Sequence, residues 1–210
     1  MAADLDKIAE SVRLGEEKTT GEIVPMVVRS SISTGHVPVI FTLTLFSLLM
    51  FVEVEFSQAI AGLIPVFPMW LLAPLSLVLS YLLSLPLSRL SLVARAATSD
   101  ADEAHAVNLR AELEFHRGQY TKTQDRTAIL IFVSLLERRA VVLADKAIAD
   151  KIGSEAWDEI VGLLIAGLKK GDFVGGWQRA IARAGELLAE HFPASKHDKN
   201  ELSNRLVIKD

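Results

Sequence analysis

The segment TAILIFVSLLERRAVVLAD occupies residues 127–145 and predicts two adjacent β-strands. Residues 127–134 form a continuous apolar run of mostly β-branched, aliphatic and aromatic side chains, which is typical of a buried strand. Residues 139–144 form a second run, and the turn at residues 135–138 is short enough for an antiparallel hairpin. Upstream, EIVPMVVR at residues 22–29 predicts a third strand. The soluble part of the chain therefore contains a β-sheet.

Amphipathic helices are predicted on both sides of these strands. Apolar side chains recur at helical spacing in four segments, which cover residues 4–19, 99–117, 154–168 and 177–192. Ser154 is the expected N-cap of the third helix. The order of elements predicts an α/β fold, in which a mixed sheet is sandwiched by helices and the first two strands are parallel through a right-handed crossover.

A long apolar segment interrupts this fold after the first strand. The chain is 23% charged overall, but Glu53 and Glu55 are the only ionised side chains in residues 30–88. A helix over residues 38–56 would be about 28 Å long, close to the thickness of a bilayer's hydrocarbon core. Residues 69–88 contain no charged side chain. We therefore expect a two-span transmembrane helical hairpin.

The expected domain organisation follows from this insertion. A discontinuous α/β domain covers residues 1–29 and 98–193, and the transmembrane hairpin covers residues 37–90. The polar segment 194–210 is expected to be a loosely ordered tail.

The distribution of basic residues predicts the orientation in the membrane. Arg29 precedes the first span, Arg89 and Arg95 follow the second, and the connector at residues 53–68 has no Lys or Arg. By the positive-inside rule both termini and the soluble domain are cytoplasmic, so we expect a multi-pass protein of the cell (inner) membrane.

A stripe of small residues marks the second span. Ser76, Ser80, Ser84 and Ser88 recur every four residues, which allows another helix to approach closely. The stripe packs either against the first span or against a partner, which would be another membrane protein or a second copy of the chain.

Three acidic residues are the best candidates for chemistry. The predicted strand directions bring Glu22, Asp125 and Asp145 together at the cytosolic end of the sheet. Oxygen-only ligands suit Mg²⁺ or Ca²⁺. The alternative is that these acids are ordinary loop and capping residues without a cofactor.

The turn between the second and third strands is expected at the opposite end of the sheet, facing the bilayer. Leu135 and Leu136 would rest at the lipid interface, and Arg138 and Arg139 would lie near anionic headgroups. The alternative is a plain turn that faces water.

Several function classes are excluded or unsupported. The chain has no Cys, which excludes disulfides, thiolate metal sites and cysteine nucleophiles. Its net charge is −4 and it has no basic block, so nothing indicates nucleic-acid binding. No GxSxG, HExxH or P-loop motif occurs. Lys169 and Lys170 are expected to complement the dipole at a helix end, with phosphate binding as the alternative.

Three segments carry a resemblance to a known family: TTGEIVPMVVRSS, FHRGQYTKTQDRTAILIFVSLLERRAVVLADKAIADKI and GELLAEHFPASKHDKNEL. The chain resembles the TPM-domain family, in particular its membrane branch with a two-helix transmembrane insertion. The resemblance implies an α/β sandwich. It also implies either a phosphatase or divalent-metal role or an accessory role. Ala128 and Ala147 replace glycines that are usual in the family, and TKTQDR replaces its acidic Gly-Asp turn, which argues against carrying the phosphatase over.

The leading hypothesis is a membrane-anchored, non-enzymatic accessory or assembly module that interacts with lipid and with another membrane protein. The alternative is a divalent-metal-dependent acid phosphatase acting near the membrane. A channel or carrier built by oligomerisation is a third class, although neither span has an ionisable residue near its centre.

Overall fold

The computed structural model describes residues 2–32, 37–56, 58, 62, 69–88, 99–118, 120, 127–194 and 200–210. The chain divides into two compact units. One comprises Met1–Ile32 and Ala101–Asp210, and the other comprises Ser33–Asp100.

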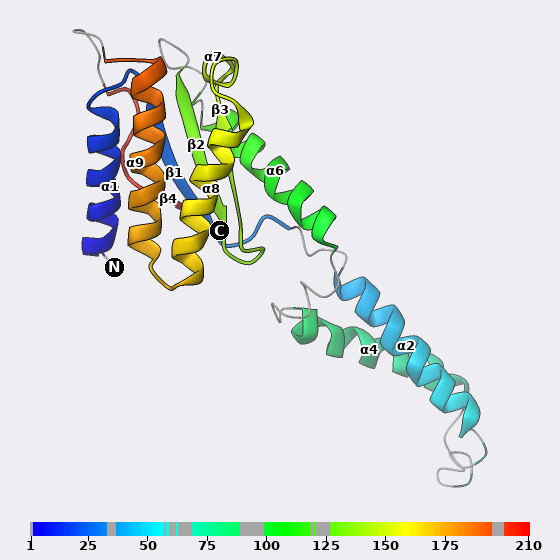
Figure 1. The fold of residues 1–210 in the computed structure, drawn as a ribbon. Helices are drawn as coiled ribbons and strands as arrows, with labels where there is room; N and C mark the ends of the chain where they lie inside the picture. Colours follow the sequence, from blue (N-terminus) through cyan, green and yellow to red (C-terminus); the bar gives the residue numbers. More distant parts are fainter. Residues whose placement is uncertain are drawn as a thin grey trace. The chain divides into compact units, whose positions relative to one another are not determined.

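The first unit is built on a four-stranded mixed sheet with the order β3-β2-β1-β4 (Figure 1). Strands β1 (Glu22–Val28), β2 (Ala128–Ser134) and β4 (Val207–Lys209) run parallel, whereas β3 (Arg139–Ala144) runs antiparallel to β2. The predicted parallel pairing of the first two strands and the antiparallel hairpin are therefore confirmed. All seven side chains of β2 are buried, as its uninterrupted apolar sequence predicts for a central strand.

Helices cover both faces of this sheet (Figure 1). On one face α1 (Ala2–Glu16), α8 (Ser154–Lys169) and α9 (Phe173–His191) enclose a core that includes Ile8, Ile131 and the fully buried Trp177. On the other face α6 (Asp100–Arg117) packs Val107, Ala111 and Phe115 against Met26 and Phe132. The predicted α/β fold with a mixed sheet between helices is confirmed at this level.

Helices α1 and α9 approach each other through glycines. A Cβ atom added to Gly185 would lie 2.6 Å from the carbonyl oxygen of Gly15, closer than real Cβ contacts allow. The absence of a side chain at Gly185 therefore sets the distance between these two helices.

Two predicted helix details are wrong. A short helix, α7 (Lys146–Ala149), follows β3, where we expected only a loop. Ser154 is the first residue of α8 and not its N-cap. The N-cap is Gly153, which has no side chain to offer a capping hydrogen bond.

The expectation of a loosely ordered tail is also wrong for its end. Leu206 is buried in the core, and β4 pairs with β1 from Met26 to Val28. The ammonium group of Lys209 pairs with the buried carboxylate of Glu114, which also lies 3.0 Å from Arg110 Nε. Burial raises the pKa of Glu114, but these two cations outweigh it and hold the pKa below its usual value. A polar sequence is thus ordered by strand pairing and by a buried ion cluster.

The second unit consists of α2 (Val37–Glu55), a 3₁₀ turn η2 (Met69–Leu71) and α4 (Leu72–Ser88). Among the described residues, one helix is long and apolar enough to cross a membrane, over Pro38–Glu55. The apolar helix Leu72–Leu87 is shorter. The prediction of two spans is therefore supported by helix length only for the first.

Candidate functional site

The edge of the sheet where β1 begins holds two of the three predicted acidic residues. Glu22 pairs with Ala128 in the strand register, and the backbone amide of Asp145 donates to the Ala128 carbonyl at 2.9 Å. Both carboxylates are buried. Asp125, the third member of the predicted set, lies outside the described residues.

These two carboxylates bind backbone amides. Glu22 accepts hydrogen bonds from the amides of Glu201, at 2.9 Å, and Leu202, at 3.3 Å, and so fastens the C-terminal segment to β1. Asp145 Oδ1 accepts from the amide of Lys146 at 2.7 Å, as the N-cap of α7. Asp145 Oδ2 is buried without a hydrogen-bond partner.

The described residues at this edge do not fit a Mg²⁺ or Ca²⁺ site. Ca²⁺ takes six to eight oxygen ligands, and Mg²⁺ binds through one or two carboxylates whose oxygens are free to face the ion, together with waters. Of the oxygens of Glu22 and Asp145, only Asp145 Oδ2 is without a hydrogen-bond partner among the described residues. Within the described part of the chain, no three His, Cys, Asp or Glu residues are grouped so that they could hold a metal. We therefore derive no chemistry through a metal from these residues.

The turn between β2 and β3 lies at the opposite edge of the sheet. Two of its amides continue the hydrogen-bonding pattern of β1 and β2 past the end of β1. The amide of Leu135 donates to the Val28 carbonyl at 3.1 Å, and the amide of Leu136 donates to the Arg29 carbonyl at 3.0 Å. The turn is therefore attached to the backbone that leads from β1 towards α2.

The four predicted membrane-contact residues of this turn have different surroundings. Leu135 and Arg138 are exposed, and Leu136 is half-buried. Arg139 lies on the α6 side of the sheet, where its Nε is 3.7 Å from the buried carboxylate of Glu103. Arg139 thus also takes part in an ion pair within the α/β unit, and the lipid contact of all four residues stays a prediction.

Glu137, in the middle of the turn, is buried, with 2% of its surface exposed. Its Oε1 accepts hydrogen bonds from the Ser30 hydroxyl at 2.8 Å and from the amides of Ser31 and Ile32 at 3.1 Å. Its Oε2 accepts from the Ser134 hydroxyl. Burial raises the pKa of Glu137, but these hydrogen bonds outweigh it and keep the pKa below its usual value. The carboxylate therefore remains charged and fixes the path of residues 30–32.

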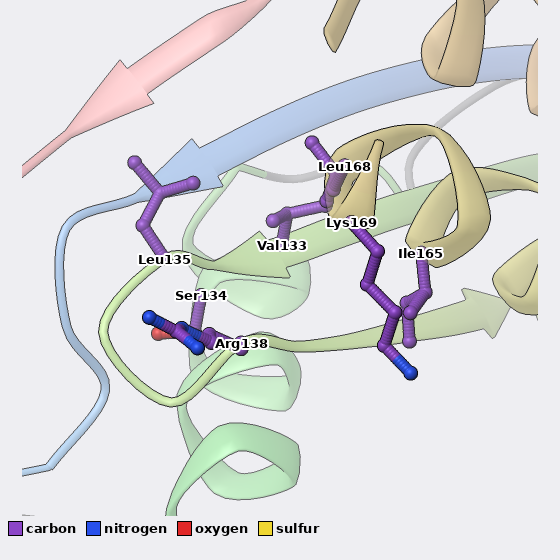
Figure 2. Close-up of a pocket in the computed structure, with 7 residues that line it drawn as sticks. All are labelled: Val133, Ser134, Leu135, Arg138, Ile165, Leu168 and Lys169. Atoms are coloured by element: carbon purple, nitrogen blue, oxygen red, sulfur yellow. The ribbon is translucent and has the colours of Figure 1, made fainter. Parts of the chain in front are cut away.

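A cavity of about 470 Å³ lies between this turn and the C-terminal end of α8 (Figure 2). Apolar side chains form its walls, and Arg138 and Lys169 provide cationic groups. Seven residues line it: Val133, Ser134, Leu135, Arg138, Ile165, Leu168 and Lys169. None of them carries a negative charge.

Sequence reasoning found part of this cavity. Leu135 and Arg138 were predicted as lipid contacts, and Lys169 as a residue that could bind phosphate. Ile165 and Leu168 were missed, because their spacing on α8 is the same as that of core-facing residues. Only the packing of α8 against β3 brings these side chains beside the turn.

The serine stripe lies between the two helices of the second unit. Ser76, Ser80 and Ser84 are buried, and a hydrogen bond of 2.8 Å joins the hydroxyls of Ser84 and Thr42 on α2. Ser76 Oγ is 4.0 Å from Met50 Sδ. The side chain of Ser88 lies outside the described residues. The described part of the stripe thus packs against the first helix, which was the first of the two predicted alternatives.

Comparison with known proteins shows the fold and no more. No family model matches the chain, and no curated protein matches it. The chain is similar to the NMR structure of BA42 protein from the psychrophilic bacterium Bizionia argentinensis, with a TM-score of 0.61 and 20% sequence identity. That match covers 99% of this chain and 94% of the other. At this identity the likeness supports an α/β fold but carries no function.

Proposed function

We propose that this protein is a membrane-anchored, non-enzymatic accessory module of the inner membrane. In this proposal α2 and α4 cross the bilayer as a hairpin, and the α/β unit serves another membrane protein from the cytoplasmic side. The proposal also assigns the chain to the membrane branch of the TPM-domain family. The observation that carries the proposal is the reversed polarity of the hairpin.

A helical hairpin that is stable in water buries apolar side chains and exposes polar ones. In this hairpin the buried contact between the helices includes Thr42, Ser76, Ser80 and Ser84. The outward surface is apolar, and Phe51 and Val54, for example, are 64% and 67% exposed. Small polar residues between helices and apolar residues outside are the arrangement that a lipid environment favours.

The length of the second helix is compatible with a second span. The 17 residues of α4 give about 26 Å of helix, and the preceding 3₁₀ turn extends the apolar helical segment to about 31 Å. The hydrocarbon core is about 30 Å thick, and spans as short as about 17 residues occur. In the proposed orientation Glu53 and Glu55 lie on the outer side, because the arginines flank the other ends of the spans.

The two buried acidic residues at the edge of the sheet where β1 begins have structural roles, which supports a non-enzymatic function. The carboxylates of Glu22 and Asp145 hold the C-terminal segment and cap α7, so both have structural work in the fold. The apolar outer surface of α2 and α4 offers other membrane helices a place to pack, which supports a partner in the bilayer.

The experiment is photo-crosslinking in native membranes. A photoreactive phenylalanine analogue replaces Leu79, which is exposed on α4, and the matched control carries it at the neighbouring buried Ser80. We expect resistance to alkaline carbonate extraction and one adduct of constant mass from position 79 that position 80 does not form. Release by carbonate would contradict the anchor. Turnover of a phosphomonoester with Mg²⁺, Ca²⁺ or Mn²⁺ that disappears in Asp145→Asn would favour the phosphatase.

A further inference from the structure

The cavity between the β2–β3 turn and α8 combines an apolar wall with two cationic side chains, Arg138 and Lys169. Val133, Ile165 and Leu168 contribute aliphatic surface. Within the described part of the chain, neither Arg138 nor Lys169 has an ion-pair or hydrogen-bond partner. The volume of about 470 Å³ falls within the roughly 300–1,000 Å³ of small-molecule sites.

The position of Arg138 is unusual for its residue type. Its φ angle is +53°, in the left-handed region that favours glycine and asparagine. The buried carboxylate of the preceding Glu137 holds the turn through four hydrogen bonds. The turn therefore presents the Arg138 guanidinium at the cavity from a fixed backbone.

The turn that lines the cavity is hydrogen-bonded to a segment that lies only a few residues before α2. That segment comprises residues 28–32, and α2 begins at Val37. Five peptide links connect Ile32 with Val37, which is at most about 18 Å of extended chain. If α2 enters the bilayer, lipid headgroups lie within reach of the cavity.

We propose that this cavity binds the headgroup and adjoining glycerol of one anionic phospholipid, with Arg138 and Lys169 at the phosphate and with Leu135, Ile165 and Leu168 against the apolar part. The inference rests on the proposed membrane anchor for the source of the ligand. A free phosphate compound offers the same anionic group but no apolar part to cover the wall, so the two sources differ in a measurable way.

Native mass spectrometry of the full chain released from detergent micelles tests the proposal. The probes are phosphatidylglycerol, zwitterionic phosphatidylcholine of the same acyl chains, and inorganic phosphate. We expect one phosphatidylglycerol to be retained in preference to phosphatidylcholine, and no competition by millimolar phosphate. Lipids bound around the hairpin add equally to the retained lipid in all variants. Differences in retention between variants therefore report on the cavity.

The variants remove the two charges without straining the turn. Arg138→Asn is compatible with the left-handed backbone, and Lys169→Gln leaves the surface of α8 polar. Each is expected to weaken phosphatidylglycerol binding about five-fold, and the double variant roughly 30-fold. The matched control, Lys18→Gln with Lys170→Gln, removes two exposed lysines that do not line the cavity and should bind like wild type. Leu168→Trp, which fills the cavity, should also weaken binding.

The outcomes separate this inference from the proposed function. Equal retention by the double variant and by wild type overturns the cavity assignment, and so does displacement of the lipid by inorganic phosphate. Either result can occur while the protein still resists carbonate extraction, in which case the anchor stands alone. Selective lipid binding by a protein that carbonate extracts would support the lipid site in the cavity and contradict the membrane anchor.

Discussion

The carboxylate of Glu137 accepts a hydrogen bond of 2.8 Å from the hydroxyl of Ser30, a residue 107 positions earlier in the chain. This bond and those to the next two amides join the β2–β3 turn to the segment that leads towards α2. Glu137 thus fixes the backbone of residues 30–32, the last described residues of this segment.

Replacement of Glu137 should destabilise the α/β unit. Glu137→Ala leaves the half-buried donors at residues 30–32 and the buried hydroxyl of Ser134 without their acceptor, which should lower the free energy of unfolding by about 2 kcal/mol. Glu137→Gln keeps one acceptor oxygen and should lose less. Thermal unfolding of the full chain, followed by tryptophan fluorescence to which the buried Trp177 contributes, measures both. Equal melting temperatures for all three proteins would show that the carboxylate does not hold the turn.

The contribution of Glu137 should also depend on pH. Its pKa is lower in the folded protein than in the unfolded chain, so its stabilising effect is complete above the unfolded value of about 4.3. The effect is lost as the pH falls through the folded pKa. The difference in stability between wild type and Glu137→Ala should therefore be constant near neutral pH and shrink below about pH 4. A difference that grows on acidification contradicts this assignment.

Two Gly→Ala substitutions should have opposite effects, because only one of the two glycines lies at the close contact of α1 with α9. Gly185→Ala places a methyl group 2.6 Å from the Gly15 carbonyl oxygen and should cost about 1–3 kcal/mol. Gly162→Ala, on the exposed face of α8, meets nothing within 4 Å and should stabilise by about 0.5–1 kcal/mol. Melting temperatures check both, and a stabilised Gly185→Ala would be inconsistent with the packing described.

Asp145→Asn distinguishes a cap from a metal ligand. Asparagine caps helices about as well as aspartate, so stability should change by only a few tenths of a kcal/mol. Mg²⁺, Ca²⁺ or EDTA should then shift the melting temperature of neither wild type nor variant. A metal-dependent stabilisation of wild type that Asp145→Asn abolishes would restore the metal site.

The membrane topology can be determined by labelling single introduced cysteines, because the chain has no native Cys. We expect an impermeant thiol reagent to label Gln58→Cys in intact spheroplasts and to leave Asp158→Cys, on the exposed surface of α8, unlabelled until lysis. The reverse pattern would invert the proposed orientation.

The sequence predicts elements whose signal is local. Strand β3 is found with the predicted bounds, residues 139–144, because an apolar run between two charged boundaries is readable without tertiary information. Strand β4 was missed, because three residues of a polar tail become a strand only by pairing with β1 and by the contact of Lys209 with Glu114.

The same limit applies to the candidate sites. Glu137 lies in a short turn beside two arginines, and its burial depends on donors more than 100 positions away, which no local sequence pattern shows. Glu22 and Asp145 lie at the same edge, on either side of β2, as the predicted strand directions require, but their backbone partners at Glu201, Leu202 and Lys146 are visible only in the fold.

The central claim is that lipid surrounds the hairpin of α2 and α4. Spin labels at Leu43, Leu79 and Gln58, each introduced as a single cysteine in the full chain reconstituted in phosphatidylcholine–phosphatidylglycerol vesicles, test this by electron paramagnetic resonance. We predict that labels at 43 and 79, which are exposed on α2 and α4, collide with oxygen dissolved in the lipid and are protected from an aqueous nickel chelate, while the label at 58 shows the opposite. Full access of the nickel chelate to positions 43 and 79 would contradict the membrane anchor.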